Sequence, residues 1–450
     1  MNIFSVIILL ALLADYLLNL IADLLDLRSI DKELPEEFRD VIDEQTYEKA
    51  QLYTRTRTKF GIVTGSVSLA ALLIFWFAGG FNWLDQWISG WGYDVIGSGL
   101  FYIGALVLFK TILSLPFSIY STFVIEEEFG FNKTTPKTFV TDLFKSLMLS
   151  VIIGAPLLAG VIAFFEYGGP LAWIWAWAVV TVVMLIIQFI APTWIMPLFN
   201  KFEPLEEGEL RQKIRDYAAR VHFPLQGVSV MDGSKRSTKS NAFFTGFGKN
   251  KRIALFDTLI EKHTHDELIA VLAHEIGHYK KKHIPKNMVI SILHMGVMFG
   301  LLSIFLNVPG LFEAFYMEQM SVYAGLVFFG LLYSPAEMLL SIGMQLLSRK
   351  YEYEADAFAA RTIDNPESMV NVLKKLSRDN LSNLTPHPFQ VFINYSHPPV
   401  LNRIRAIRKA AKSGRLPDAE AKLEAKAKSE AKAEPEVKAE SEVKKAEEGD

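Results

Sequence analysis

The sequence contains no cysteine among its 450 residues. This absence excludes disulfide bonds, catalysis by a thiolate and metal sites built on cysteine. It also removes the side chain that would accept a prenyl or palmitoyl group on this chain itself. Histidine, aspartate and glutamate therefore remain as the strong ligands for any metal ion.

The sequence also carries little net charge. Its formal charge is only −3, so no global field attracts a polyanion, and we expect no nucleic-acid partner. Hydrophobic residues make up 51% of the chain, which exceeds the share in ordinary soluble domains. This composition predicts a protein that lies in a lipid bilayer.

Seven apolar stretches are long enough to cross the hydrocarbon core of a bilayer, which is about 30 Å thick. The first lacks the basic region and the small-residue cleavage site of a signal peptide, so we expect it to remain as a membrane span. The fourth and fifth are joined by a tight turn, as in a hairpin of two membrane helices. The predicted spans cover approximately residues 2–22, 61–84, 97–121, 147–166, 170–194, 286–308 and 321–346.

Lysine and arginine are absent from alternate connections between these stretches. The connections after the second, fourth and sixth stretches contain neither residue, whereas those after the first and third and the region 195–285 are basic. The positive-inside rule then places the N-terminus outside, and the region 195–285 with everything after about residue 347 in the cytoplasm. Asp15 and Lys110 lie within apolar stretches, where charges usually face a wet interior, although Asp15 could instead lie near an interface.

The region between the fifth and sixth stretches has the pattern of a mixed α/β domain. Residues 226–231 resemble a short strand, and 241–247 with 252–256 resemble a β-hairpin. Thr264-His265-Asp266-Glu267 is a capping-box pattern and is followed by apolar residues at helical spacing. We therefore expect a helix from about residue 265 to about Pro285.

His274, Glu275 and His278 form an HExxH pattern in the middle of this predicted helix. Two histidines at positions i and i+4 project from one face, so both imidazoles can bind one metal ion. Zinc would lower the pKa of a bound water and polarise a substrate carbonyl, while Glu275 would take the proton of that water. Chance occurrence on a charged helix is the alternative, and the helical context favours a catalytic site with one zinc ion per chain.

A catalytic zinc site needs a third protein ligand. Glu352, Glu354 and Asp356 compete for this role, and Glu352 and Asp356 share one helical face. The HExxH helix adjoins the cytoplasmic end of the sixth predicted span, and the segment with the three acidic residues adjoins that of the seventh. These two spans form a hairpin, so we expect the acidic residues to lie near the metal. We favour Glu352 as ligand and Asp356 as the partner that holds an imidazole in place. The alternative is a solvated helix of mixed charge.

Two further segments could belong to the site. His397, which precedes two prolines and is followed by Arg403, could donate a hydrogen bond to a developing oxyanion, although a lone histidine before proline is more often structural. The strand that begins at Asn241 could bind an extended peptide by edge pairing, or it could be an ordinary structural hairpin. We expect structural roles for the other histidines, and His283 could compete only if the helix were distorted. These histidines are His222, His263, His265, His283, His294 and His387.

The end of the chain has a different composition. Beyond about Pro417 the sequence becomes a repeat of Ala, Lys and Glu without aromatic residues, which cannot bury a core. The patterns divide the chain into spans one to five (1–194), the first part of a metalloprotease domain with the HExxH helix (195–285), spans six and seven (286–346), the second part of that domain with the third ligand (347–416) and a low-complexity tail (417–450).

Taken together, the motifs resemble those of the CAAX prenyl protease 1 family, the integral-membrane zinc endopeptidases. The resemblance extends from about residue 30 to about 410. It implies that Glu352 binds zinc, that Asn241 and His397 contact substrate, and that Arg403 accompanies them. The matching segments are 127–134, 197–202, 241–246, the HEIGH motif, 349–356 and His397-Pro398 with Arg403.

The resemblance also implies a mainly α fold in which seven membrane helices enclose a chamber, capped by a metalloprotease domain with a small β-hairpin. Members of this family cleave after a prenylated cysteine and release the last three residues of a protein or peptide. The Ala/Lys/Glu tail, the short outer loops and the lack of cysteine depart from eukaryotic members. They indicate a bacterial homologue in the cell membrane, with the endoplasmic reticulum membrane as the alternative.

Two other functions are compatible with the same motifs. A quality-control protease without prenylated substrates would use the same residues for catalysis. A transporter with a structural metal site would not require Glu275, whose presence beside the predicted metal favours the enzyme.

Overall fold

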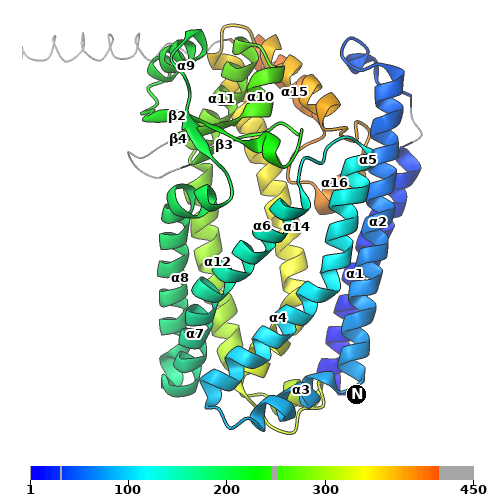
Figure 1. Ribbon diagram of the computed structural model, residues 1–450, viewed down its shortest axis with the longest axis vertical. Helices are drawn as coiled ribbons and strands as arrows, with labels where there is room; N and C mark the ends of the chain where they lie inside the picture. The colour runs from blue at the N-terminus through cyan, green and yellow to red at the C-terminus, as the bar shows by residue number, and fades with distance from the viewer. Residues whose placement is uncertain (1, 31–32, 246–251, 415–450) are drawn as a thin grey trace, which may run out of the picture.

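The computed structural model of the protein describes residues 2–30, 33–245 and 252–414. Long helices form one end of the molecule, and a sheet with shorter helices forms the other (Figure 1). α1 begins at the end opposite the sheet. The mainly α fold class is confirmed, and the predicted tail at 417–450 lies outside the described residues.

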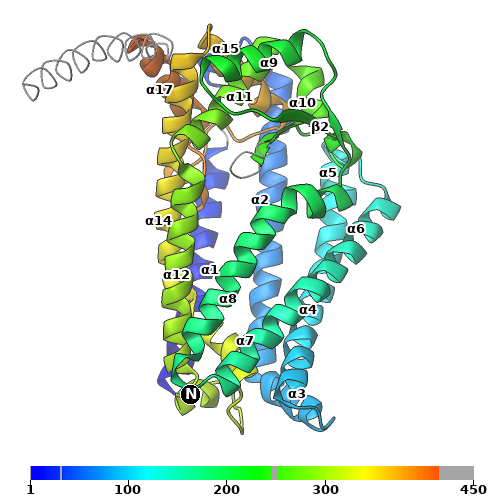
Figure 2. The same ribbon diagram turned by 90° about the vertical axis from the view of Figure 1, so that its left-hand side faces the viewer.

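Seven helical segments in the described part of the chain are long and apolar enough to cross a membrane, which confirms the predicted number. They are α1 (Ile3–Ser29), α2 (Glu44–Phe77), α4 with its continuation (Val95–Glu128), α6 with α7 (Pro136–Tyr167), the segment around α8 (Gly169–Leu198), α12 (His283–Phe305) and α14 (Val322–Thr362). Within the longer segments, α4 is Val95–Tyr120, α5 is Glu126–Glu128, α6 is Pro136–Leu149, α7 is Ala155–Tyr167 and α8 is Ala172–Ile190. Figure 2 shows α12 beside α14, and the two helices are in contact.

The second predicted span differs most from the structure. α2 begins at Glu44, well before the predicted stretch 61–84, and ends at Phe77, so the predicted end at residue 84 is wrong. Gly79 adopts a left-handed φ of 75°, and a separate helix, α3 (Gly80–Ser89), starts directly after it. Glycine permits this conformation at little cost. Hydropathy alone misses the break because the residues on both sides of Gly79 are apolar.

The helix of the seventh span continues without interruption beyond the predicted end at residue 346. α14 contains 41 residues, which corresponds to about 60 Å of helix and is about twice the thickness of the hydrocarbon core. Glu352 and Asp356 therefore lie on the extension of a membrane helix rather than on a separate segment.

A four-stranded sheet lies at the end of the molecule opposite the N-terminus, with the strand order β1-β2-β4-β3. β2 pairs with β4 in parallel, and β3 pairs with β4 in antiparallel fashion, which confirms the predicted hairpin. The turn of the hairpin lies outside the described residues. The strands are β1 (Phe202–Pro204), β2 (Gly227–Met231), β3 (Ala242–Thr245) and β4 (Arg252–Phe256).

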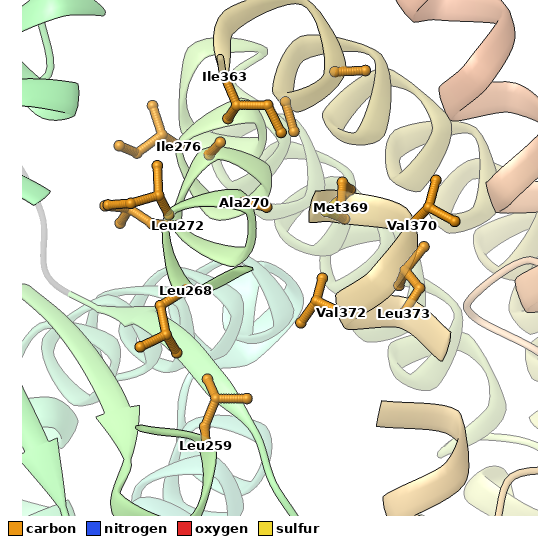
Figure 3. Close-up of a cluster of buried hydrophobic side chains, with 14 of the residues drawn as sticks. Leu259, Leu268, Ala270, Leu272, Ile276, Ile363, Met369, Val370, Val372 and Leu373 are labelled. Atoms are coloured by element: carbon orange, nitrogen blue, oxygen red, sulfur yellow. The ribbon is translucent and has the colours of Figure 1, made fainter. Parts of the chain in front are cut away.

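The HExxH helix is anchored by a hydrophobic core (Figure 3). Leu268, Leu272 and Ile276, spaced four residues apart on α11 (His265–Lys280), are fully buried. Met369 and Val372 of α15 belong to the same buried cluster. Burial of each such large side chain stabilises the fold by about 1.5–3 kcal/mol. The other described elements are η1 (Glu36–Phe38), α9 (Glu209–Arg220), η7 (Gly233–Lys235), α10 (Asp257–Lys262), α13 (Pro309–Glu313), α15 (Glu367–Asp379), α16 (Pro388–Asn394) and α17 (Val400–Lys412).

Candidate metal centre and active site

The start of α11 is fixed by the capping box that the sequence predicts. The Thr264 hydroxyl accepts a hydrogen bond from the Glu267 amide at 3.4 Å, and Glu267 Oε2 accepts one from the Thr264 amide at 2.9 Å. Burial would raise the pKa of Glu267, but the hydrogen bonds from Lys375 and from the Thr264 amide outweigh it, so the pKa is lowered. The ionised carboxylate also suits the positive end of the helix dipole.

The end of α11 differs from the prediction. The helix stops at Lys280 rather than near Pro285, and Lys282 adopts a left-handed φ of 58° before α12 begins at His283. Side chains of apolar and polar type continue at helical spacing across this point, so periodicity does not reveal the break. The turn changes the direction of the chain directly after the HExxH motif.

Glu352 of α14 lies against both histidines of α11. Its Oε2 atom is 3.5 Å from His274 Nε2, and its Oε1 atom is 3.3 Å from His278 Nε2. The two Nε2 atoms are 3.1 Å apart. One ligand atom from each side chain lies within 4.8 Å of the others, and in the described part of the chain this is the group of histidine and acidic residues that could hold a metal ion.

The close approach of the two helices depends on Gly277. A Cβ atom at this position would lie 3.0 Å from the Cα and the carbonyl oxygen of Ala355. This is backbone of the facing helix, which cannot rotate away as a side chain would. The glycine between Glu275 and His278 therefore allows α14 to bring Glu352 within reach of both imidazoles.

The buried oxygen of Glu352 tests whether these residues suit a metal ion. Glu352 is only 4% exposed, and its Oε2 atom is buried without a hydrogen-bond partner among the described residues. Arg403 Nη1 lies 3.4 Å from this oxygen without forming a hydrogen bond. A buried carboxylate oxygen that accepts no hydrogen bond is costly. Two imidazole nitrogens and one carboxylate oxygen are typical ligands of a divalent metal ion such as zinc. The donor set and the buried oxygen that accepts no hydrogen bond both fit a metal ion.

Asp356 and Arg403 support His274 from behind. Asp356 Oδ1 is 2.8 Å from His274 Nδ1, and Arg403 of α17 donates to both Asp356 oxygens at 2.7 and 2.8 Å. Asp356 is completely buried. Burial opposes the charged form of Arg403, but the Asp356 carboxylate outweighs it and raises the pKa of Arg403. Arg403 Nη1 also lies 3.4 Å from Glu352 Oε2.

Glu275 follows His274 and precedes His278 in the sequence, and its side chain is half-buried. Burial raises the pKa of Glu275, and the charges of His274 and His278 oppose this shift. A raised pKa moves the carboxylate towards the basicity that proton transfer near neutral pH requires. This shift is compatible with the role of general base that the sequence predicts for Glu275.

The structure brings His397 to the same group, whereas no hydrogen bond or ion pair among the described residues joins Asn241 to it. His397 is exposed, and its Nε2 atom lies 3.5 Å from Glu352 Oε1. Asn241 directly precedes β3 at the edge of the sheet, and β3 packs against α11. Among the described residues, Asn241 makes no hydrogen bond or ion pair with the His274, His278 and Glu352 group.

The structure gives His283 contacts that the sequence did not predict. This residue was expected to be structural, yet its Nδ1 atom lies 2.9 Å from His278 Nδ1, and its Nε2 atom lies 3.1 Å from Glu354 Oε2. Glu354, which competed with Glu352 as a ligand, therefore pairs with a histidine outside the three-residue metal group. The sequence shows a histidine five residues after His278. This histidine can reach His278 only because the chain turns at Lys282.

Comparisons with known proteins agree with this site. A family model described as "CAAX prenyl protease N-terminal, five membrane helices" matches residues 24–201, and one described as "Peptidase family M48" matches residues 204–411. The chain is 37% identical over 396 residues to the CAAX prenyl protease 1 homolog of Arabidopsis thaliana, covering 85% of this chain and 93% of that protein. It is 36% identical over 410 residues to CAAX prenyl protease 1 of Saccharomyces cerevisiae, covering 84% and 89%.

The fold agrees as well. The crystal structure of S. mikatae Ste24p superposes with a TM-score of 0.85 at 34% sequence identity, covering 90% of this chain and 99% of that one. A similarity of this extent includes the membrane helices and the metalloprotease domain. The chain therefore belongs to the CAAX prenyl protease family of M48 peptidases and is a multi-pass membrane metalloendopeptidase.

Proposed function

We propose that this protein is a zinc endopeptidase that removes the C-terminal tripeptide from prenylated CAAX proteins or peptides. The observation that carries the proposal is the convergence of His274, His278 and Glu352 beside Glu275, in a chain whose relatives are CAAX prenyl proteases. The chain covers 93% of the length of the Arabidopsis relative, so no large part of that protein lacks a counterpart.

The distances between the three ligand atoms favour one zinc ion per chain. Ligands bonded to a tetrahedral zinc at about 2.0–2.1 Å lie about 3.3–3.4 Å from one another. The two imidazole Nε2 atoms are 3.1 Å apart, close to this spacing. The Glu352 carboxylate reaches them with different oxygens, Oε1 at 3.3 Å from His278 Nε2 and Oε2 at 3.5 Å from His274 Nε2. Zinc would supply polarisation of the substrate carbonyl and a lowered pKa for one water molecule.

The chain's own residues supply the proton transfers. Glu275 accepts a proton from the attacking water and delivers it to the nitrogen of the departing tripeptide, so the peptide C–N bond breaks without a free charge on the leaving group. Asp356 accepts a hydrogen bond from the Nδ1–H group of His274, and Nε2 of that ring is then available as a metal ligand. Arg403 keeps Asp356 ionised in its buried position.

His397 is the candidate donor to the developing oxyanion. Its Nδ1 atom lies 2.9 Å from the Ser396 hydroxyl. When that hydroxyl donates to Nδ1, the ring proton resides on Nε2, the atom that faces the Glu352 side of the site. An exposed ring in this position can reach a substrate that lies over the three ligands.

β3 is the candidate binding site for the substrate backbone. Because the strand order is β1-β2-β4-β3, β3 has one free edge in the described part of the sheet. An extended peptide can pair with such an edge. Asn241 at the start of β3 would then contact the substrate, as would Arg403 if the substrate carboxylate reaches it.

The location of the enzyme in the cell follows from its basic segments. We propose that the domain with α11 lies on the cytoplasmic side, with residues 195–285 and 347–416 forming its two parts. The bacterial cell membrane and the endoplasmic reticulum membrane are both compatible with this orientation, and the bacterial origin stays a prediction.

The proposal is tested with purified full-length protein, zinc and a farnesylated CAAX peptide. We expect release of the C-terminal tripeptide by the wild type and a rate about 10²- to 10⁴-fold lower for Glu275→Gln, because general base catalysis is worth about this much. Product identification by mass spectrometry and zinc content of both proteins are measured together. Retained zinc in Glu275→Gln shows that the loss is catalytic.

The same experiment separates the alternatives. Equal cleavage by wild type and Glu275→Gln contradicts the proposed mechanism. Equal cleavage of the farnesylated peptide and its non-prenylated counterpart favours a quality-control protease over a processing enzyme. If zinc-loaded wild type cleaves neither prenylated nor unfolded substrates, the enzyme function is wrong.

A further inference from the structure

His283 turns back onto the metal-binding helix. Residues five positions apart on a continuous helix point in directions about 140° apart, so His278 and His283 could not meet on such a helix. In the structure their Nδ1 atoms are 2.9 Å apart. The meeting depends on the end of α11 at Lys280 and on the left-handed conformation of Lys282.

The ring of His283 is held firmly in this position. It is only 2% exposed, and it stacks on the Tyr351 ring with a centroid separation of 3.9 Å and an interplanar angle of 10°. Tyr351 lies on α14, one residue before Glu352. The Lys286 ammonium lies 5.5 Å from the centroid of the same tyrosine ring. The first residue of the sixth span is thus packed between α11 and α14.

The hydrogen bonds assign one proton to each ring. His278 Nε2 faces His274 and Glu352 and is the atom available to a metal ion, so a metal-bound ring must carry its proton on Nδ1. Nδ1 then donates to His283 Nδ1, and His283 must carry its own proton on Nε2. That nitrogen lies 3.1 Å from Glu354 Oε2, which can accept the hydrogen bond.

The opposite assignment is incompatible with a bound metal. If His283 Nδ1 donated to His278 Nδ1, the neutral His278 ring would carry its proton on Nε2, pointing at the ligand group. The chain His278–His283–Glu354 therefore favours the metal-binding tautomer of His278. It does so without a charge on either ring.

We propose that His283 and Glu354 are positioning residues for His278, fixing the orientation and the tautomer of this ring for zinc binding. The inference rests on the proposed zinc site. Because His283 begins the sixth span and Glu354 lies on the extension of the seventh, the relative position of these two spans also bears on the orientation of His278. Partners of this kind typically change metal affinity by about 10- to 100-fold.

The experiment compares three substitutions of His283 in the full-length protein. Asn places its amide oxygen where Nδ1 lies and can still accept from His278, Gln instead reaches towards Glu354, and Phe retains a ring for the stack on Tyr351. Zinc affinity is measured by chelator competition, and the melting temperature of each zinc-free protein is measured in parallel.

We expect zinc binding to weaken about 10- to 100-fold in His283→Phe and in His283→Gln. His283→Asn should remain within about threefold of the wild type because it retains the acceptor that His278 needs. The zinc-free proteins should melt at similar temperatures. A merely structural role would instead lower those temperatures and would not separate Asn from Gln.

Two results overturn the inference: His283→Phe that binds zinc as tightly as the wild type, or His283→Asn that loses as much affinity as His283→Phe. Should His283→Phe fail to fold, Glu354→Ala makes the same test, with an expected loss of about fivefold or more, and an unchanged affinity overturns the inference. Zinc binding is measured without substrate. A wild type that binds zinc but cleaves no CAAX peptide would refute the proposed function and leave this inference intact.

Discussion

The two imidazoles of the HExxH motif are supported in different ways. Behind His274 stands a fully buried carboxylate, Asp356, which is held by two hydrogen bonds from Arg403. His278 contacts the His283 ring, and His283 in turn contacts Glu354, whose side chain is 32% exposed. The first support is a buried ion pair in which removal of one partner leaves a charge unpaired. The second has no buried charge to lose, so we expect it to tolerate substitution better.

Substitution Asp356→Ala should have the largest effect. It removes the acceptor behind His274 and leaves the buried Arg403 guanidinium beside an empty space, which costs about 3–5 kcal/mol of folding free energy in comparable pairs. We expect a lower melting temperature of the zinc-free protein and little bound zinc, measured by thermal unfolding and metal analysis.

The control for this change is Arg403→Ala combined with Asp356→Ala, which removes both charges. If the double variant is as unstable as the single one, the unpaired guanidinium does not explain the loss. A wild-type melting temperature for Asp356→Ala would remove the proposed asymmetry between the two supports.

Substitution Gly277→Ala should damage both supports together. The new methyl group would meet the backbone of Ala355 at about 3.0 Å, and overpacking of this kind costs about 1–3 kcal/mol. Because α14 carries Glu352, Glu354 and Asp356, a shift of this helix moves all three carboxylates. We expect weaker zinc binding and a reduced kcat, although alanine is a better helix former than glycine.

The matched control is Gly343→Ala on α14, where a Cβ atom meets nothing within 4 Å. It should leave zinc affinity unchanged. Equal behaviour of the two glycine variants would show that the close contact between α11 and α14 does not set the geometry of the ligands.

The smallest effect is expected for Glu354→Gln. The side-chain amide oxygen can still accept the hydrogen bond from His283, and only a partly exposed charge is removed. Zinc affinity should fall by no more than about threefold, whereas Asp356→Asn should lower it by about tenfold or more. Chelator competition on both variants compares the two supports directly. A larger loss for Glu354→Gln than for Asp356→Asn would reverse their order.

Local signals predicted the elements whose cause is local. The capping box at Thr264 and the spacing of Leu268, Leu272 and Ile276 correctly placed the start and the buried face of α11. The breaks at Gly79 and Lys282 were missed because each depends on a single backbone conformation within a pattern that continues on both sides. Of these two, only Gly79 carried a residue type that favours the left-handed region.

The sequence by itself determined the number of membrane spans and the HExxH pattern, because hydropathy and helical spacing are properties of contiguous residues. It left Glu352, Glu354 and Asp356 as competitors on one segment. The tertiary structure gives them different partners: α14 places Glu352 against both Nε2 atoms, Asp356 against His274 Nδ1, and Glu354 against His283. The close packing at Gly277 and the turn at Lys282 contribute to this arrangement, and neither is encoded in the spacing of the three carboxylates.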